Sequence, residues 1–434
     1  MRRVIALVGT LIMAVAIAPS AAADADGQHG QRRPVIFVHG FSGSGLQFQT
    51  QAKRLASNGY PAEIIETHDY DSTFATETAE QVLARLDQRI ARLLARTGAD
   101  RVDLLGHSLG TAMSQTYLAF PDRAARVAHY VNLDGRTAPA PPGGVPTLAV
   151  WGEGDPARAI AGATNVYLAD QSHTQVVTSP ETFAQIHAFF TGRAPRTTRI
   201  VPEPFAADVS GRAVLFPTNV AVAGARLEIY ELTSITGQRR RSSPDATFEL
   251  TGDGSWGPFR ARGLSRYEFA IVRVGAPTHH LYFQPFLRTD RLVMLLTSLP
   301  GTGLSALTEV SDAHTNLVVS RNKEWWGDQG EAGDELWING RNVLNAANSP
   351  RAKRVIGMFL YDRSVDQVTD LTAPIPAFFA TPFITGMDVF IPAAPRNLGL
   401  AVVVARGRGS GFDALIVPNW PSADHRITLQ FNDY

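Results

Sequence analysis

Short runs rich in β-branched residues alternate with amphipathic stretches between Pro34 and Gly192. This alternation is typical of strands joined by crossover helices, so it predicts an α/β domain with a mostly parallel sheet. The expected strands are Val35–His39, Glu63–Thr67, Val102–Leu105, Val127–Leu133, Thr147–Trp151 and Asn165–Leu168.

Two helices have clear start or stop signals. One is expected from Glu77 to Arg96, where apolar residues recur at helical spacing and Gly98 follows as a C-terminal cap. Another begins at Ser179-Pro180, a capping residue followed by proline in the first turn. A third helix-like stretch is Thr111–Phe120.

The pattern changes after residue 192. Residues 193–205 are basic and interrupted by prolines, and short alternating strands with Gly, Pro, Asn and Asp turns then continue to Tyr434. We therefore expect an α/β domain at 26–195, a β-sandwich at 196–276 and a second β-rich domain at 277–434. The run from Val222 to Tyr230 and the segments after it, as far as Phe269, resemble transthyretin-like and carboxypeptidase-regulatory sandwiches.

Composition excludes some functions. The 434 residues include 40 basic and 40 acidic side chains, so no charge surplus indicates nucleic acid as a partner. Without cysteine there is neither a disulfide nor a lipoprotein anchor, and large apolar cores must supply the stability.

The N-terminus has the layout of a secretory signal. Arg2-Arg3 precede the apolar run Val4–Ala18, and small residues follow before Asp24. We assign residues 1–25 to a signal peptide and expect a secreted protein without a stable membrane anchor, because the apolar run is short for a spanning helix.

The pentapeptide Gly106-His107-Ser108-Leu109-Gly110 lies between an expected strand and an expected helix. That context is typical of a nucleophile elbow, a tight turn that presents a serine hydroxyl. The alternative is an ordinary strand-turn-helix junction capped by serine. The candidate base, acid and oxyanion donors elsewhere in the chain favour the elbow, and Ser108 is the predicted nucleophile.

A serine nucleophile needs a base and an acid that orients the base. His173 follows the last expected strand of the domain and precedes its last helix, so it is the predicted base. Two aspartates compete as the acid. Asp155 follows the penultimate strand and is favoured by a narrow margin, and Asp134 at the end of the preceding strand is the alternative.

Acyl transfer also needs N–H donors for the developing oxyanion. Leu109 N–H, directly after the nucleophile, is one expected donor. Phe41 N–H is the other, because it lies in the glycine-rich loop that follows the first strand.

With these motifs, residues 34–192 resemble an α/β hydrolase of the small bacterial lipase type, with a short connection where larger lipases insert a lid. The order of a hydrolase domain and then β-rich domains resembles archaeal two-domain lipases. Those act on long-chain esters and place the acid at the earlier strand, which keeps Asp134 open.

We therefore expect a secreted serine esterase or lipase that needs no cofactor and acts on medium- to long-chain acyl esters, insoluble or polymeric ones included. A polyester depolymerase or an acyltransferase with the same triad is one alternative, and an inactive hydrolase that serves as a binding protein is another. Acidic residues around Asp328 and Asp334 are interpreted as a solvated loop rather than a calcium site.

The β half is expected to cover the cleft or grip substrate through aromatic residues. Because every expected catalytic residue precedes Gly192, we also expect a truncated hydrolase part to cleave short esters unaided. The aromatic candidates are Trp256, Trp325, Trp326 and Trp337.

Overall fold

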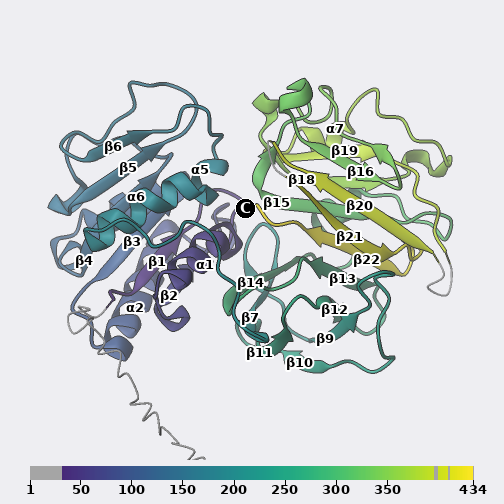
Figure 1. Ribbon diagram of the computed structural model, residues 1–434, viewed down its shortest axis with the longest axis horizontal. Helices are drawn as coiled ribbons and strands as arrows, with labels where there is room; N and C mark the ends of the chain where they lie inside the picture. The colour runs from purple at the N-terminus through teal and green to yellow at the C-terminus, as the bar shows by residue number, and fades with distance from the viewer. Residues whose placement is uncertain (1–31, 395–398, 409–410, 434) are drawn as a thin grey trace, which may run out of the picture. The chain divides into compact units, whose positions relative to one another are not determined.

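Six strands near the N-terminus of the chain form a fully parallel sheet in the order β2-β1-β3-β4-β5-β6 (Figure 1). The computed structural model describes residues 32–394, 399–408 and 411–433, and the predicted signal peptide lies outside them. All six predicted strands are present, and the α/β class is confirmed. They are β1 (Val35–Val38), β2 (Ile65–His68), β3 (Val102–His107), β4 (Val127–Leu133), β5 (Thr147–Trp151) and β6 (Thr164–Tyr167).

Helices cover both faces of this sheet because its strands are apolar on both sides. Along β1, Val35 and Phe37 join the core formed with α1, α5 and α6, whereas Ile36 and Val38 join the core formed with α2 and α3. The helices are α1 (Gln49–Ser57), α2 (Ala79–Thr97), α3 (Leu109–Leu118), α4 (Pro121–Ala124), α5 (Gln175–Thr178) and α6 (Pro180–Thr191).

Gly98 and Ser179 act as the predicted helix signals, whereas α2 begins at Ala79, two residues after the predicted start at Glu77. Thr78 and Gln81 form a capping box at the start of α2, and Gly98 ends that helix in the left-handed region at φ 69°. At α6 the Ser179 side chain accepts a hydrogen bond from the Thr182 N–H. Among the described residues, no helix is both long enough and apolar enough to cross a bilayer.

The β half is built on an eight-stranded sheet in the order β10-β9-β12-β13-β22-β15-β18-β19. Its first four strands pack on a second sheet, β11-β7-β14 with β8 beside β7, around a core that includes Trp256 and Phe269. These strands are β7 (Ala206–Leu215), β8 (Val220–Ala221), β9 (Ala225–Leu232), β10 (Ala246–Leu250), β11 (Ser255–Arg262), β12 (Arg266–Val272), β13 (Thr278–Phe283) and β14 (Asp290–Thr297).

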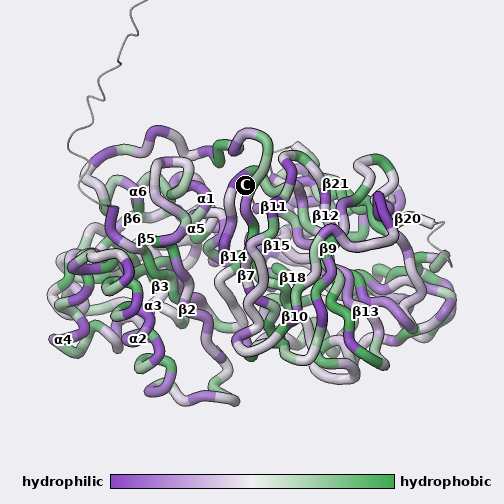
Figure 2. Tube along the Cα trace, turned by 90° about the horizontal axis from the view of Figure 1, so that it is seen from below, coloured by the Kyte–Doolittle hydropathy of each residue, from purple (hydrophilic) through white to green (hydrophobic). Residues whose placement is uncertain are grey.

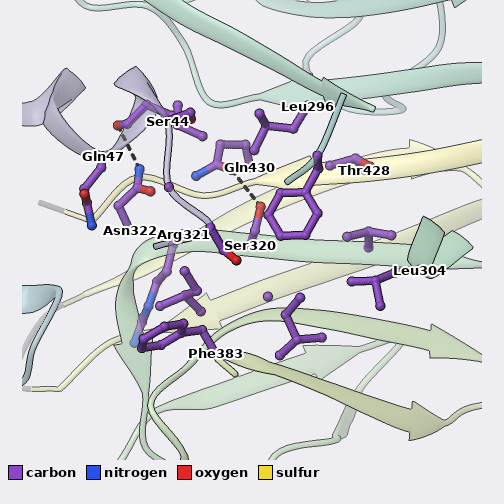
Figure 3. Close-up of a pocket in the computed structure, with 18 of the residues that line it drawn as sticks. Ser44, Gln47, Leu296, Leu304, Ser320, Arg321, Asn322, Phe383, Thr428 and Gln430 are labelled. Atoms are coloured by element: carbon purple, nitrogen blue, oxygen red, sulfur yellow. Dashed lines mark hydrogen bonds between the residues drawn. The ribbon is translucent and has the colours of Figure 1, made fainter. Parts of the chain in front are cut away.

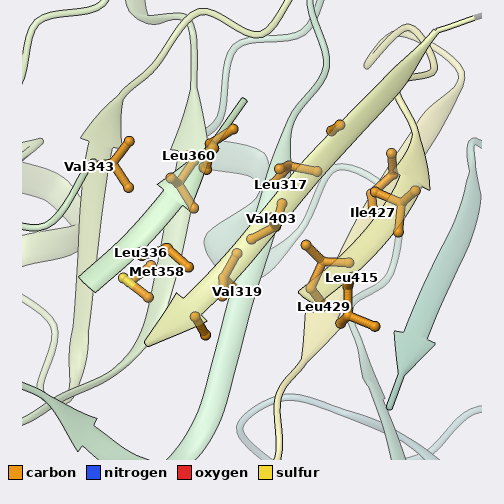
Figure 4. Packing of buried hydrophobic residues seen from close by; sticks show 14 of the residues in the cluster. Leu317, Val319, Leu336, Val343, Met358, Leu360, Val403, Leu415, Ile427 and Leu429 are labelled. Carbon is orange, nitrogen blue, oxygen red and sulfur yellow. The ribbon is translucent and has the colours of Figure 1, made fainter. Parts of the chain in front are cut away.

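The last four strands of the eight-stranded sheet pack on a third sheet, β17-β16-β20-β21, around a second core (Figure 4). Hydrophobic and hydrophilic stretches alternate along this half of the chain (Figure 2). The elements are β15 (Leu317–Trp325), β16 (Glu335–Ile338), β17 (Arg341–Asn342), β18 (Val355–Tyr361), α7 (Pro376–Phe379), β19 (Ile384–Asp388), β20 (Leu400–Arg406), β21 (Phe412–Pro418) and β22 (His425–Gln430).

One sheet therefore serves both β cores. Residue 276 lies in the turn between β12 and β13, which pair antiparallel within that sheet. The domain boundaries at 195 and 276 stay predictions.

The expectation that the tryptophans grip substrate is not supported by their burial. Trp256, Trp325 and Trp326 are 4%, 0% and 7% exposed, because their rings fill the β cores or lie under arginine side chains. Trp337 is 36% exposed, and like the other three it does not line the cavity that holds Ser108.

The α/β part and the β half contact each other through polar groups, of which one pair is buried. Lys53 of α1 pairs with Asp290 of β14 at 3.3 Å, and both side chains are buried. The Asn322 amide donates to the Leu46 carbonyl at 3.1 Å. Arg351 pairs with Glu153 at 2.8 Å. Residues Arg33–Tyr434 accordingly form a single unit.

Candidate active site

Ser108 lies between β3 and α3 with φ 52° and ψ −120°, a backbone conformation that a serine rarely adopts. Its N–H donates to the Leu133 carbonyl at 3.1 Å, which ties the turn to β4. The turn is the strained strand-to-helix junction that an elbow requires.

The flanking glycines are needed because other backbone approaches too closely. A Cβ on Gly106 would lie 2.7 Å from the Gly110 carbonyl oxygen, and one on Gly110 would lie 2.1 Å from the Val38 carbonyl oxygen. Any larger side chain would push α3 away from β1.

His173 follows β6 in the loop that leads to α5, and its Nδ1 lies 2.6 Å from Asp134 Oδ2. A carboxylate only accepts hydrogen bonds, so this contact places the imidazole proton on Nδ1 and leaves Nε2 as an acceptor. That is the tautomer that a general base for a serine hydroxyl needs.

Asp134 is held by several donors besides the histidine. Its Oδ1 accepts from the Gly152 N–H at 2.9 Å and from Arg158 Nη1 at 2.8 Å. Burial alone would raise the pKa of Asp134, but the bond from His173, the Gly152 N–H and the Arg158 charge outweigh it and lower the pKa to about 2.

Asp155, which the sequence favoured as the acid, does not contact His173. It is exposed, and its carboxylate accepts only a local bond from the Ala157 N–H at 2.8 Å in its own turn. The structure corrects this preference: the aspartate beside His173 is Asp134, at the end of β4. The order of serine, aspartate and histidine along the chain is retained.

The lowered pKa of Asp134 predicts how stability depends on pH. Because the folded pKa of about 2 lies below the ordinary 3.8, the ionised carboxylate stabilises the folded state above pH 3.8, and this contribution is lost as the pH falls towards 2. The contribution is about 2 kcal/mol. We expect the loss of unfolding free energy in Asp134→Asn to be largest above pH 4 and to shrink below it. Urea denaturation at pH 7, 4 and 3 measures this, and a constant difference would contradict it.

His107, within the elbow, contacts the loop that carries His173. Its Nε2 donates to the His173 carbonyl at 3.0 Å, and the two rings lie 4.6 Å apart. Burial lowers the pKa of His107 well below its usual range, and the neighbouring His173 lowers it further. The His107 side chain is therefore neutral and structural.

The expected oxyanion donors have free N–H groups. Neither Phe41 N–H nor Leu109 N–H meets an acceptor among the described residues, although the neighbouring Ser42 N–H donates to Ser72 Oγ at 2.8 Å. Unpaired N–H groups beside a nucleophile are available to a developing negative charge.

The loop that carries Phe41 is held in place from both halves of the chain. The His39 ring stacks on Tyr70 at 4.4 Å, and its Nδ1 donates to the Gly40 carbonyl at 2.8 Å. The Asn219 amide of the β half donates to the carbonyls of Gly43 at 2.8 Å and Tyr70 at 3.0 Å. The β half therefore contributes to the geometry of the expected oxyanion loop.

Ser108 and His173 line one cavity of about 160 Å³. Figure 3 shows that its walls come from both halves, with Ser44 and Gln47 facing Ser320, Asn322 and Gln430. Many lining residues of the β half are apolar, among them Phe216, Leu296, Leu304, Val318, Ile356, Phe359, Phe383 and Ile384.

In the described part of the chain, no group of three or more His, Cys, Asp or Glu side chains is arranged to hold an ion. The interpretation as a solvated loop is wrong for Asp334, which is 5% exposed and accepts from Arg321 at 2.8 Å and from the Trp326 N–H at 2.8 Å.

The parallel sheet, the strained turn at Ser108 and the Asp134–His173 pair are features of the α/β hydrolase fold. Residues 33–144 match the family model described as the α/β hydrolase fold, and residues 206–300 match the lipase C-terminal domain. A third model, described as a C-terminal domain, matches residues 303–434. The family models thus assign the α/β hydrolase fold to the N-terminal part of the chain and a lipase C-terminal domain to the strands that follow it.

Several solved structures are similar to part of this chain. A CIB-like hydrolase from Thermoplasma acidophilum is 20% identical with a TM-score of 0.28, over 38% of this chain and 87% of its own. A structure described under the metagenome-derived lipolytic enzymes LipS and LipT is 16% identical with a TM-score of 0.30, and the match covers 38% of this chain and 95% of that one. Lipase B from Aspergillus fumigatus is 14% identical with a TM-score of 0.31, and the match covers 38% of this chain and 54% of that one.

Three supporting residues were not anticipated from the sequence. Arg158 holds Asp134, Asn219 holds the Phe41 loop, and the Phe383 ring lies parallel to His173 at 6.2 Å. Asn219 and Phe383 come from the β half, far along the chain, where no local motif marks them.

Proposed function

We propose that this protein is a serine carboxylic-ester hydrolase that forms an acyl-enzyme on Ser108. One observation carries the proposal: a single cavity holds Ser108 on a strained elbow together with His173, whose Nδ1 is bound at 2.6 Å by the buried Asp134. These are the nucleophile, base and orienting acid of acyl transfer.

In the proposed reaction, Ser108 Oγ attacks the ester carbonyl carbon while His173 Nε2 takes the hydroxyl proton. Asp134 stabilises the imidazolium, and the N–H groups of Phe41 and Leu109 stabilise the oxyanion. The intermediate collapses as His173 returns the proton to the leaving alcohol. Water, activated by His173, then releases the acid from Ser108.

The apolar walls of the cavity support medium- to long-chain acyl groups as substrates. Phe216, Leu296 and Leu304 of the β half line the same cavity as Ser108, so an acyl chain attached to the serine has apolar surface beside it. Each buried methylene contributes about 0.8 kcal/mol.

Labelling and hydrolysis test this function directly. A fluorophosphonate should modify Ser108 stoichiometrically, and p-nitrophenyl esters should be hydrolysed without added metal. A polyester film and emulsified triglyceride, assayed in parallel, identify which insoluble esters are accepted. A protein that neither reacts with the probe nor hydrolyses any ester would be the binding protein considered above.

Chain-length preference gives a further prediction. We expect p-nitrophenyl octanoate to have a kcat/KM at least tenfold above that of the acetate, because the longer chain buries more apolar surface. Leu304→Trp, which narrows the cavity, should shift the optimum to shorter chains. Leu307→Trp is the matched control, since Leu307 lies in the same 3-10 helix, Gly303–Leu307, but is 47% exposed and does not line the cavity. An equal shift in both variants would contradict the proposed acyl site.

Secretion is also proposed, from the charged, apolar and small-residue layout of residues 1–25. N-terminal sequencing of the exported protein should find a start near Asp24 or Asp26.

A further inference from the structure

Glu324, near the end of β15 in the β half, reaches the loop that carries His173. Its side chain is fully buried, and its carboxylate accepts hydrogen bonds from the residues on both sides of the histidine. Oε2 accepts from Ser172 Oγ at 2.5 Å and from the Gln175 N–H at 3.0 Å, and Oε1 accepts from the Thr174 N–H.

We propose that Glu324 is a positioning residue for catalysis, through which the β half fixes the loop of the general base. This inference rests on the proposed role of His173. Three hydrogen bonds reach this one carboxylate from Ser172, Thr174 and Gln175, which lie directly before and after the histidine in sequence. Removing the carboxylate would leave the Thr174 and Gln175 N–H groups without their acceptor, and the Ser172 hydroxyl with only its longer contact to Gln175 Oε1 at 3.3 Å.

The backbone around Glu324 is shaped to direct its side chain at this loop. The pairing of β15 with β18 is irregular between Ser320 and Trp325, so consecutive residues Glu324 and Trp325 are both buried. Irregularities of this kind redirect a side chain out of the usual alternation. Arg321 Nη2 donates to the Glu324 carbonyl at 2.6 Å and fixes the bend.

His173 is thereby held from several directions. Asp134 holds Nδ1, His107 holds the carbonyl, and Glu324 holds the residues before and after. The first two contacts orient the ring and its own backbone, whereas Glu324 determines where the loop lies relative to β3. A displacement of about 1 Å at a reacting group costs on the order of a hundredfold in rate.

The test compares Glu324→Gln and Glu324→Ala with the wild-type protein, using p-nitrophenyl butyrate well below the melting temperature. We expect kcat to fall about tenfold in Glu324→Gln, because one amide oxygen replaces two acceptors and its NH2 faces donors. In Glu324→Ala we expect a fall of about a hundredfold. KM should change less than twofold, since Glu324 itself does not line the cavity. A raised KM with unchanged kcat would overturn the proposal.

Glu268→Gln is the matched control. Glu268 is also fully buried in the β half, but it contacts Arg239 and His280 instead of the His173 loop. The melting temperature of Glu268→Gln should fall, and its kcat should equal that of the wild-type protein. An equal loss of kcat in Glu268→Gln and Glu324→Gln would show a general effect of instability and overturn the inference.

Ser172→Ala keeps the test decisive if Glu324→Ala does not fold. It removes only the hydroxyl donor, and kcat should fall severalfold. Wild-type kcat in both Ser172→Ala and Glu324→Gln would refute the role of Glu324. A wild-type protein without any esterase activity would refute the proposed function itself, so the two failures are distinguishable.

Discussion

Ser108→Ala is expected to abolish ester hydrolysis, with a loss of at least about a thousandfold in kcat and an unchanged melting temperature. The nucleophile is removed, while the elbow geometry depends on the flanking glycines rather than on the hydroxyl. His173→Ala should be nearly as severe, because the residues of a triad act as a unit. Initial rates on p-nitrophenyl butyrate and thermal melts measure both.

Ser265→Ala is a suitable control for the loss of one serine hydroxyl. Its Oγ donates to Glu231 in the β half, and Ser265 does not line the cavity. It should keep wild-type kcat. If Ser108→Ala retained more than a few per cent of the activity, or if the fluorophosphonate still labelled that variant, another residue would have to be the nucleophile.

The fold of the α/β part could be predicted closely because its signals are local. Helix α2 shows this: its apolar stripe and its terminating Gly98 lie within the helix or directly at its end. The elbow is equally local, since its glycines and Ser108 are consecutive in sequence. Such features are determined by neighbours a few residues apart, which a sequence displays directly.

Local sequence signals could not decide which aspartate, Asp134 or Asp155, orients His173. Asp134 and Asp155 both follow strands of the parallel sheet, and the spacing alone favours neither. The difference is in the side-chain environment: Asp134 is buried under Arg158 and His173, and Asp155 is turned to solvent. That environment depends on how two loops pack, which no short motif records.

The β half also has a closer relation to the site than the sequence indicated. All expected catalytic residues do precede Gly192, but Glu324, Asn219 and Phe383 contact the His173 loop, the Phe41 loop and the His173 ring. These contacts remove the basis for expecting a truncated hydrolase part to cleave short esters unaided.

Asp134→Asn is expected to lower kcat on p-nitrophenyl butyrate by about a thousandfold or more. An amide at this position either presents its NH2 to His173 Nδ1, which favours the wrong tautomer, or loses its bond from Arg158. In both orientations the charge that stabilises the imidazolium is gone. KM should change little, because Asp134 does not line the cavity.

Asp155→Asn is the matched control, and the sequence alone predicted the opposite ranking. Its carboxylate is exposed and accepts only the Ala157 N–H, a bond that the asparagine oxygen can also accept, so kcat should stay within about twofold of wild type. A larger loss in Asp155→Asn than in Asp134→Asn would mean that the acid is recruited from the later strand during turnover. Small losses in both would mean that neither aspartate orients His173, and the proposed base would then need another partner.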